Sequence, residues 1–333
     1  MSTHETSERQ ITFGEAVNEA LAEELRRDPD VFIIGEDVAE AGTPFKVLSG
    51  LVDEFGPERV IDSPISEAGI TGIAVGAAMT GMRPVVDIMF GDFIPLVMEQ
   101  LVNQAAKVHY MSGGKFHVPM VLRTNLGATR RSAAQHSQSL HALLSHIPGL
   151  KVAIPSSPYD AKGLLKTAIR DENPVAIFED KLMYQLKGPV PEDEYTIPFG
   201  LAEVKREGSD ITIVATSSMV HVALEAAKML SEVGISAEVI DPRTTVPLDK
   251  ETIISSARKT SRAIVVDEGY ERYGVTGEIA STIADGAFYY LDTPVKRMGA
   301  MDVPVPFSPA LEDLTVPTSE TVTEMAKVLC GHA

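Results

Sequence analysis

Glu67 precedes a run of small apolar residues, and this position gives its carboxyl group a chemical use. No other acidic residue follows until Asp87. A carboxyl group in apolar surroundings, here Ile65, Ala68 and Ile70, has a raised pKa and can hold or share a proton. An acid at this position can also simply favour the helix dipole. Glu67 is therefore either an acid–base residue or an ordinary helix-start residue.

Two further residues have side chains suited to proton transfer or ligand binding. His136 lies in the polar segment 125–139, and its imidazole titrates near neutral pH, although a lone loop histidine is also commonly structural. Glu36 directly follows an apolar segment, where α/β proteins place ligands, but it also fits an ordinary loop acid. Arg130 and Arg131 precede His136, and either become ordered around a ligand or are solvated.

These residues depend on strands and helices that alternate about every 25 to 35 residues. Short, wholly apolar segments predict strands buried on both faces, as in parallel sheets. The predicted strands are 31–35, 84–90, 119–124, 150–154, 175–179, 210–215, 237–240, 263–267 and 295–298. The predicted helices are 12–28, 94–111, 219–233, 249–259, 275–284 and 320–329, with others starting at 67 and 157. This alternation predicts two doubly wound α/β domains.

The alternation is interrupted at residues 188–199, which contain three prolines and several acids. Such a segment is typical of an interdomain linker. We therefore expect a disordered leader over 1–11, a first domain over 12–187 and a second domain over 200–333. The leader is polar and lacks the apolar core of a secretion signal.

Composition narrows the classes of partner. The 333 residues carry a net charge of −18, which argues against nucleic acid or an anionic membrane as the main partner. Cys330 is the single cysteine, so neither an intrachain disulfide nor a cysteine-based metal site is expected. No apolar run approaches the roughly 18 residues needed to span a membrane. We expect a cytoplasmic protein.

Motifs that bind phosphate or nucleotides are missing from the sequence. It has no ATP-type phosphate loop, no glycine-rich dinucleotide fingerprint, no paired-histidine zinc motif and no nucleophilic-serine elbow. Two α/β domains without a phosphate loop are unusual for an enzyme that works alone. Either the protein uses no such cofactor, or another chain holds the phosphate.

Eight short motifs occur in order along the chain. They are GEDV (35–38), DSPISE (62–67), GAAMTGMRP (76–84), MSGG (111–114), AQHSQ (134–138), IPGLKV (147–152), PYDAKGLL (158–165) and AIRD (168–171). Together they resemble the beta subunit of the thiamine-diphosphate-dependent first component of 2-oxo acid dehydrogenase complexes. The resemblance runs from about Thr12 to Val328.

This resemblance implies a transketolase-like fold, with a pyrimidine-binding domain followed by a transketolase C-terminal domain. It also implies an α2β2 heterotetramer, in which the alpha subunit binds magnesium and the diphosphate of the cofactor. The present chain has Gly91-Asp92-Phe93 rather than the alpha subunit's GDG motif. The missing phosphate loop is thereby explained, and a lipoyl-bearing acyltransferase core is implied as a further partner.

The resemblance also assigns roles within the site. Glu67 matches the glutamate that hydrogen-bonds the aminopyrimidine ring of thiamine diphosphate and favours the imino tautomer, which removes a proton from the thiazolium carbon. His136 matches a histidine at the site entrance that is implicated in transfer to the lipoyl group. Glu36 is expected near the cofactor, while Ile65 and Phe93 are either walls of the pyrimidine pocket or plain core.

Two structural roles also follow from the resemblance. Potassium is bound in some family members at positions that match Met120, Ala168, Ile169, Asp171 and Asn173. Their backbone carbonyls, carboxylate and amide are hard oxygen ligands, although an ordinary helix end explains the same residues.

Small residues recur every four positions after Glu67, at Ala68, Gly72, Gly76 and Thr80. They allow a neighbouring helix to approach closely. We expect this face at a subunit interface, with packing inside the same chain as the alternative.

Two functional hypotheses remain open. The first is a catalytic beta subunit, in which the segments 156–160 and 305–314 are most similar to those of acetoin-cleaving members, with pyruvate close behind and a branched-chain 2-oxo acid as the alternative substrate. The second is a non-catalytic subunit that supports the alpha chain and binds the core through its C-terminal domain.

Overall fold

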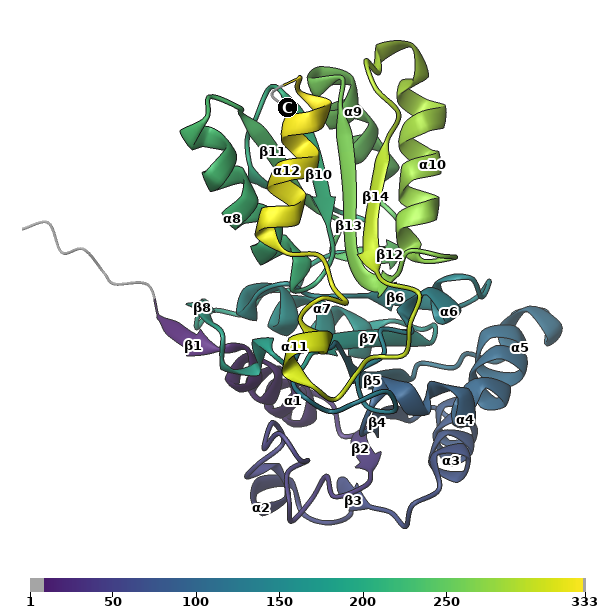
Figure 1. Cartoon of the computed structure of the whole chain (residues 1–333). Coiled ribbons are helices and arrows are strands. Elements are labelled where there is room, and N and C mark those ends of the chain that lie inside the picture. The colour runs from purple at the N-terminus through teal and green to yellow at the C-terminus, as the bar shows by residue number, and fades with distance from the viewer. Residues whose placement is uncertain (1–8, 332–333) are drawn as a thin grey trace, which may run out of the picture.

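The chain folds into two stacked α/β halves, which Figure 1 shows with the N-terminal half below the C-terminal half. This computed structural model describes residues 9–331. A seven-stranded sheet organises the N-terminal half and a five-stranded sheet organises the C-terminal half. The predicted α/β class with two sheets is confirmed.

The N-terminal sheet has the order β12-β6-β7-β5-β4-β2-β3, and its strands are parallel except for β12. Most of its residues are buried because helices cover both faces. The strands are β2 (Val31–Gly35), β3 (Val60–Asp62), β4 (Arg83–Ile88), β5 (Val121–Leu126), β6 (Lys151–Ala153), β7 (Val175–Asp180) and β12 (Thr244–Val246).

Two helical layers enclose this sheet. On one face α1 and α7 pack together, and on the other α3 packs with α4, α5 and the π-helical turn between them. The helices are α1 (Phe13–Arg27), α2 (Leu51–Phe55), α3 (Glu67–Met79), α4 (Ile94–Met98), α5 (Ala106–Met111), α6 (His141–Ser145) and α7 (Pro158–Arg170). Short 3-10 helices occupy Gly91–Phe93 and Met183–Gln185, and the π-helical turn is Glu99–Ala105. The segment predicted as one helix over 94–111 is therefore helical along its whole length, with α-helix at both ends and π-helix between them.

The first helix begins where its capping residues predict. The Glu15 amide donates to Thr12 Oγ1 at 3.1 Å, and the Thr12 amide donates to Glu15 Oε2 at 2.7 Å. These reciprocal bonds satisfy two amides that a helix start leaves without partners. Phe13, Val17 and Leu21 are fully buried, and each such side chain stabilises the fold by about 1.5 to 3 kcal/mol relative to exposure.

The C-terminal sheet has the order β14-β13-β10-β11-β9 and is covered on one face by α8 and α12 and on the other by α9 and α10. Its strands are β9 (Glu203–Arg206), β10 (Ile211–Ala215), β11 (Ala237–Asp241), β13 (Ala263–Tyr270) and β14 (Lys296–Ala300). Its helices are α8 (Met219–Glu232), α9 (Lys250–Thr260), α10 (Val275–Ala287) and α12 (Ser319–Leu329), with a 3-10 helix at Phe288–Tyr290. The edge strand β9 is antiparallel and was not predicted.

The segments expected to lack structure are partly ordered. Residues 1–8 of the expected leader lie outside the described residues, but β1 (Gln10–Thr12) pairs with β8 (Lys187–Pro189). Gln10 and Ile11 therefore form a strand rather than the end of a leader. The start of the expected linker is the other strand of this pair.

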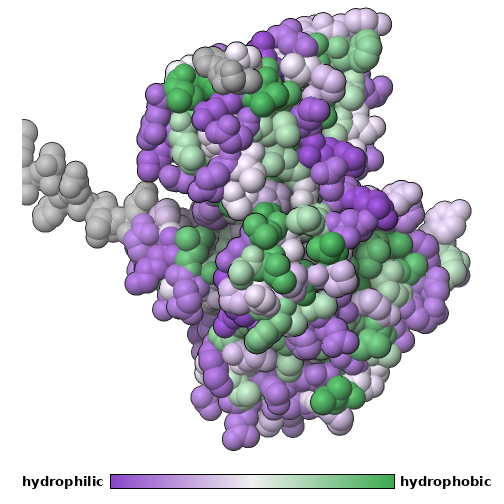
Figure 2. Space-filling model, in the orientation of Figure 1, coloured by the Kyte–Doolittle hydropathy of each residue, from purple (hydrophilic) through white to green (hydrophobic). Residues whose placement is uncertain are grey.

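Two segments of the C-terminal half reach the N-terminal half. Strand β12 joins the edge of the N-terminal sheet next to β6. The C-terminal arm, which we define as residues 301–318 with α11 (Pro309–Glu312), crosses in front of the N-terminal half in Figure 1. Apolar residues gather on the same part of the surface in Figure 2. Phe307, Leu311 and Leu314 of the arm are exposed. Among the described helices, none has the length and apolar character required to cross a membrane.

Candidate active site

The predicted site residues lie at the carboxyl ends of parallel strands in the N-terminal sheet. Glu36 follows β2, Glu67 follows β3, Phe93 follows β4 and His136 lies in the loop after β5. The loops that leave parallel strands converge at this edge of a sheet, which is where α/β proteins bind ligands. The topology therefore brings all four residues to one edge.

Glu36 and Glu67 form a pair of neighbouring acids. Glu67 is the first residue of α3 and is only 9% exposed. Burial and the Glu67 carboxylate raise the pKa of Glu36 above its ordinary value. Glu36 Oε1 is buried and has no hydrogen-bond partner among the described residues. The pair can therefore hold a proton and still form a hydrogen bond with a ligand.

The apolar enclosure expected around Glu67 is incomplete within this chain. Ile70 is buried, but Ala68 is exposed and Ile65 is 83% exposed. Ile65 therefore does not line a closed pocket made by this chain, and its place in a pocket wall stays a prediction. The open side of α3 is the side that faces away from the sheet.

His136 and Phe93 are brought together by a third ring. The His136 ring packs edge-on against Phe90 with 4.6 Å between centroids and against Phe93 with 5.5 Å. Phe90 also contacts Phe45 from the loop after β2, at 5.9 Å. These rings form an aromatic surface beside the histidine.

Asp92 fixes the loop that carries His136. Its Oδ1 accepts hydrogen bonds from the amides of Ser137 and Gln138, at 3.2 and 3.1 Å, and from the Gln138 side chain at 2.9 Å. Asp92 belongs to the 3-10 helix after β4, whose Gly91 lies so close to β5 that a Cβ would be 2.3 Å from the Asn125 carbonyl oxygen. The Gly91-Asp92-Phe93 segment, which has a phenylalanine where the GDG motif ends in glycine, therefore binds this loop through Asp92.

Arg130 and Arg131 have partners within the chain. Arg130 Nη1 donates to the Lys181 carbonyl at 3.2 Å, and its guanidinium lies 4.7 Å from the Phe45 ring centroid. Arg131 Nη1 contacts Glu312 at 2.7 Å and Asp313 at 2.6 Å, both in the C-terminal arm. Acidic and carbonyl groups of the chain therefore already bind both arginines, and their ordering around a ligand stays a prediction.

A buried ion cluster supports the strands beneath the site. Arg123 of β5 donates twice to Glu179 of β7, both at 2.7 Å, and also contacts Asp87 of β4. All three residues are buried. Because removing one partner would leave a buried charge unpaired, at a cost of about 3 to 5 kcal/mol, the cluster holds these three strands in fixed register.

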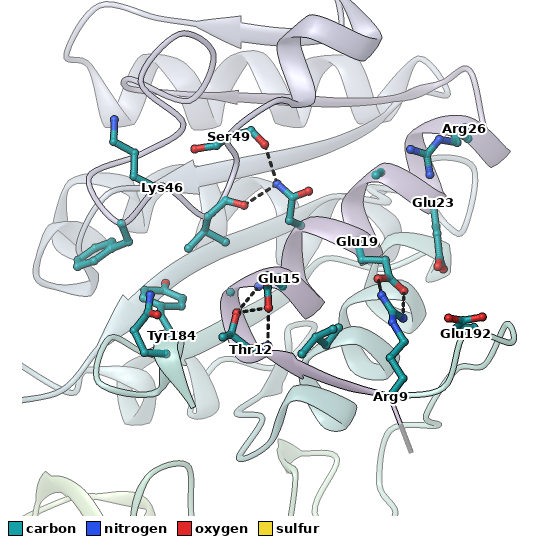
Figure 3. Close-up of a pocket in the computed structure, with 17 residues that line it drawn as sticks. Arg9, Thr12, Glu15, Glu19, Glu23, Arg26, Lys46, Ser49, Tyr184 and Glu192 are labelled. Atoms are coloured by element: carbon teal, nitrogen blue, oxygen red, sulfur yellow. Dashed lines mark hydrogen bonds and ion pairs between the residues drawn. The ribbon is translucent and has the colours of Figure 1, made fainter. Parts of the chain in front are cut away.

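A separate hollow of about 890 Å³ lies along α1 rather than at the strand ends (Figure 3). Two pairs of its labelled residues are bonded to each other, Thr12 with Glu15 and Arg9 with Glu19. None of the predicted site residues lines this hollow.

Comparison with known proteins places this arrangement in a family. Residues 9–187 match the transketolase pyrimidine binding domain, and residues 200–322 match the transketolase C-terminal domain. The chain is 51% identical to the beta subunit of acetoin:2,6-dichlorophenolindophenol oxidoreductase of Bacillus subtilis, covering 97% of this chain and 98% of the relative. The chain belongs to the transketolase-like dehydrogenase beta subunits.

Other members of this beta-subunit family are nearly as similar. The pyruvate dehydrogenase E1 beta subunit of Rickettsia felis is 49% identical, with 97% and 99% of the two chains covered. The 2-oxoisovalerate dehydrogenase beta subunit of B. subtilis is 46% identical, with 91% and 93% covered. A solved structure titled "Split gene transketolase, inactive beta4 tetramer" matches with a TM-score of 0.78 and 25% identity, over 96% of this chain and 98% of the other.

The small-residue face of α3 in this beta subunit points outward. Gly72 and Gly76 are exposed, and a Cβ at Gly76 would meet no atom within 4 Å. Ile73 beside them is 60% exposed. A Cβ at Gly72 would lie 3.8 Å from Gln100 of the same chain, whereas Gly76 faces open space, so this part of the face is open to another chain.

The carbonyl oxygen atoms predicted to bind potassium already have protein donors. The Met120 carbonyl accepts from the Val175 amide at 3.0 Å, and the Ala168 carbonyl accepts from the Asp171 amide at 3.2 Å.

The remaining groups of this set are bound as well. Arg83 Nη1 donates to the Ile169 carbonyl at 3.1 Å, Asp171 pairs with Lys151, and Asn173 donates to Asp171. These bonds do not form an open cage of oxygen atoms. They also do not test whether potassium binds here, so potassium binding stays a prediction.

Three residues of the site region were not found from the sequence. Asp92 and Lys181 each follow a buried strand, and that position could have singled them out. Glu312 carried no such signal, because its contact with Arg131 joins residues far apart in the chain.

Proposed function

We propose that the chain is the beta subunit of a thiamine-diphosphate-dependent acetoin or pyruvate dehydrogenase and that it binds the aminopyrimidine end of the cofactor at Glu67. The observation that supports this most is the buried Glu67 beside Glu36 at the strand ends, within the region that matches the pyrimidine binding domain. An aminopyrimidine is a flat ring with polar edges. A carboxyl group, a buried oxygen without a partner and the nearby Phe93 fit such a ring.

Glu67 would hold a proton at the pyrimidine ring nitrogen. Its neighbour Glu36 favours a shared proton, since two carboxylates in one buried region do not both ionise readily. When bound, thiamine diphosphate supplies a carbon nucleophile that adds to the substrate carbonyl.

His136 would act in transfer of the acyl group to the lipoyl group of an acyltransferase core. Its imidazole lies against Phe90 and Phe93 at the edge of the same site, and an imidazole can give or take a proton near neutral pH.

An alpha subunit would hold the diphosphate and its magnesium ion. This is supported by the absence of a phosphate loop from the sequence and by the outward face of α3, where Gly72 and Gly76 are exposed. We infer that this face meets the alpha subunit in an α2β2 assembly.

The experiment is co-purification of this chain with its alpha subunit, followed by turnover assays on acetoin, pyruvate and 2-oxoisovalerate with and without thiamine diphosphate. We expect cofactor-dependent turnover of acetoin or pyruvate. Identities of 51, 49 and 46% to the three kinds of relative are too close to choose the substrate. Preference for 2-oxoisovalerate would assign the branched-chain alternative, and no turnover of any of the three would favour the non-catalytic one.

A further inference from the structure

The loop that carries His136 has an unfavourable backbone. Thr129, Arg131 and Ala133 have φ angles of 63°, 62° and 59°, in the left-handed region that residues with a side chain rarely adopt. Such conformations persist only where the surroundings hold them. Asp92 binds the Ser137 and Gln138 amides of residues 128–138, which we call the His136 loop, and three further side chains hold this loop at other points.

The first point is Glu268 on β13 of the C-terminal half. Its Oε1 accepts the Ala128 amide at 2.6 Å, and the side chain is buried. Burial and the neighbouring Asp180 carboxylate hold the pKa of Glu268 well above its ordinary value. A protonated Glu268 can donate to Asp180 from one oxygen while the other binds the start of the loop.

The second point is Glu312 in the C-terminal arm. Its carboxylate accepts the Arg131 amide at 3.3 and 3.2 Å and Arg131 Nη1 at 2.7 Å. Glu312 is completely buried, so this contact is enclosed by the arm. Both of these points come from the C-terminal half.

The third point is Lys181, directly after β7. Its ammonium donates to the His136 carbonyl and lies 5.7 Å from the centre of the Phe90 ring, against which the His136 ring packs. The Lys181 carbonyl in turn accepts from Arg130 at 3.2 Å. Only 2% of Lys181 is exposed, so its ammonium is enclosed where it meets the loop.

We propose that Lys181 is a positioning residue for His136. Glu268 and Glu312 hold the same loop from the C-terminal half, and through these contacts the C-terminal half sets the geometry of a site on the N-terminal half. Lys181 contacts the His136 main chain and leaves the reacting atoms to the imidazole. This proposal rests on the proposed function, because it gives His136 a role in acyl transfer. Its structural part can be measured without the cofactor.

The structural part is tested by trypsin digestion of the full chain, with cleavage after Arg130 and Arg131 followed by mass spectrometry. Cleavage of a locally opened loop follows the population of the open form. We expect Lys181→Met to speed this cleavage about tenfold, which is about 1.4 kcal/mol, and the exposed-lysine control Lys187→Met to leave it unchanged. Equal cleavage rates in the wild type and Lys181→Met would overturn the proposal.

The functional part is tested in the assembled enzyme. We expect Lys181→Met to lower acylation of the lipoyl domain about tenfold while dye reduction falls less, and Lys181→Arg to restore most of the loss. In a His136→Ala background the Lys181→Met change should add no further loss. A full additional loss in that background would show that Lys181 acts independently of His136.

A second variant keeps the test decisive if Lys181→Met does not fold. Glu312→Gln weakens the loop from the other half and leaves Lys181 in place, so it should also speed cleavage after Arg131. No change in cleavage would contradict the role of the C-terminal half. A wild-type enzyme inactive on all three substrates would defeat the proposed function, whereas the trypsin result would still decide how the loop is held.

Discussion

At the scale of single residues, His136 is bound through its main chain and packed through its ring edges. Lys181 holds its carbonyl, while Phe90 and Phe93 contact the imidazole. This arrangement fixes where the ring lies and leaves its nitrogen atoms as the groups that can exchange a proton with a ligand. The residue is therefore suited to a step at the edge of the site rather than to activation of a cofactor deep within it.

We predict that His136→Ala slows lipoyl acylation about a hundredfold, within the range for loss of a general acid or base. Dye reduction should fall much less, because it requires no transfer to the lipoyl group. The measurement compares both rates in the co-purified enzyme, with Gln135→Ala at the exposed neighbouring position as the control. Equal loss of both rates would place His136 in the earlier chemistry.

The sequence predicted part of this site. Glu36 was singled out by its position after an apolar segment, and His136 by its position in a polar loop. The motif resemblance added Phe93. The position of Lys181 after a buried strand was a usable signal, but its contact with the His136 loop and the contact of Glu268 escaped prediction because they depend on how strands from different parts of the chain meet. The spacing of residue types along a short stretch of sequence does not indicate such contacts.

At the scale of elements, α3 joins the site to the outer surface. It starts with the buried Glu67 and exposes Gly72 and Gly76 on its outer side. A partner chain on this face would lie on the helix that begins with Glu67. One helix can thus serve both the cofactor site and the assembly.

We predict that Gly76→Leu dissociates the α2β2 assembly without unfolding the chain. A Cβ at this position meets no atom within 4 Å, and leucine ranks just below alanine in helix propensity, whereas glycine is about 0.8 to 1 kcal/mol less favourable than alanine. Size-exclusion chromatography of the co-expressed subunits measures the effect, and Glu225→Leu at an exposed position of α8 is the control. An unchanged elution volume with Gly76→Leu would contradict the interface.

Elements with a long apolar pattern were predicted, whereas several short strands were not. The apolar face of α1 and the buried strand β2 each have a pattern several residues long, and both occur as predicted. Strands β1, β8 and β12 have three residues each and exist because a distant strand pairs with them. Their sequences contain too few residues to show an alternating pattern.

At the scale of the whole molecule, a buried charged cluster joins the two halves. Asp160 of α7 contacts Arg243 at 2.8 Å and Lys205 at 3.1 Å, both from the C-terminal half. Burial and the nearby Asp160 carboxylate raise the pKa of Asp241 to about 7. The ordinary value of an aspartate is about 3.9, so the folded chain keeps this proton where the unfolded chain has lost it.

We predict that Asp241→Asn flattens the pH dependence of stability between about pH 4 and pH 7. In this window the folded state binds more protons than the unfolded state, so the free energy of unfolding falls as pH rises, by up to about 4 kcal/mol for this group. Denaturant unfolding of both proteins across the window measures the difference. Parallel curves for the wild type and the variant would show that Asp241 does not titrate there.

The central claim is that Glu67 activates the cofactor, and the most direct test is the turnover number of Glu67→Gln in the co-purified, thiamine-diphosphate-saturated enzyme. Glutamine keeps the size of the side chain but cannot hold the carboxyl proton, so the assembly should elute as the wild type does while turnover falls by at least about a hundredfold. Glu58→Gln, an exposed acid just before β3, should retain full activity. Turnover of Glu67→Gln within about twofold of the wild type would contradict the account.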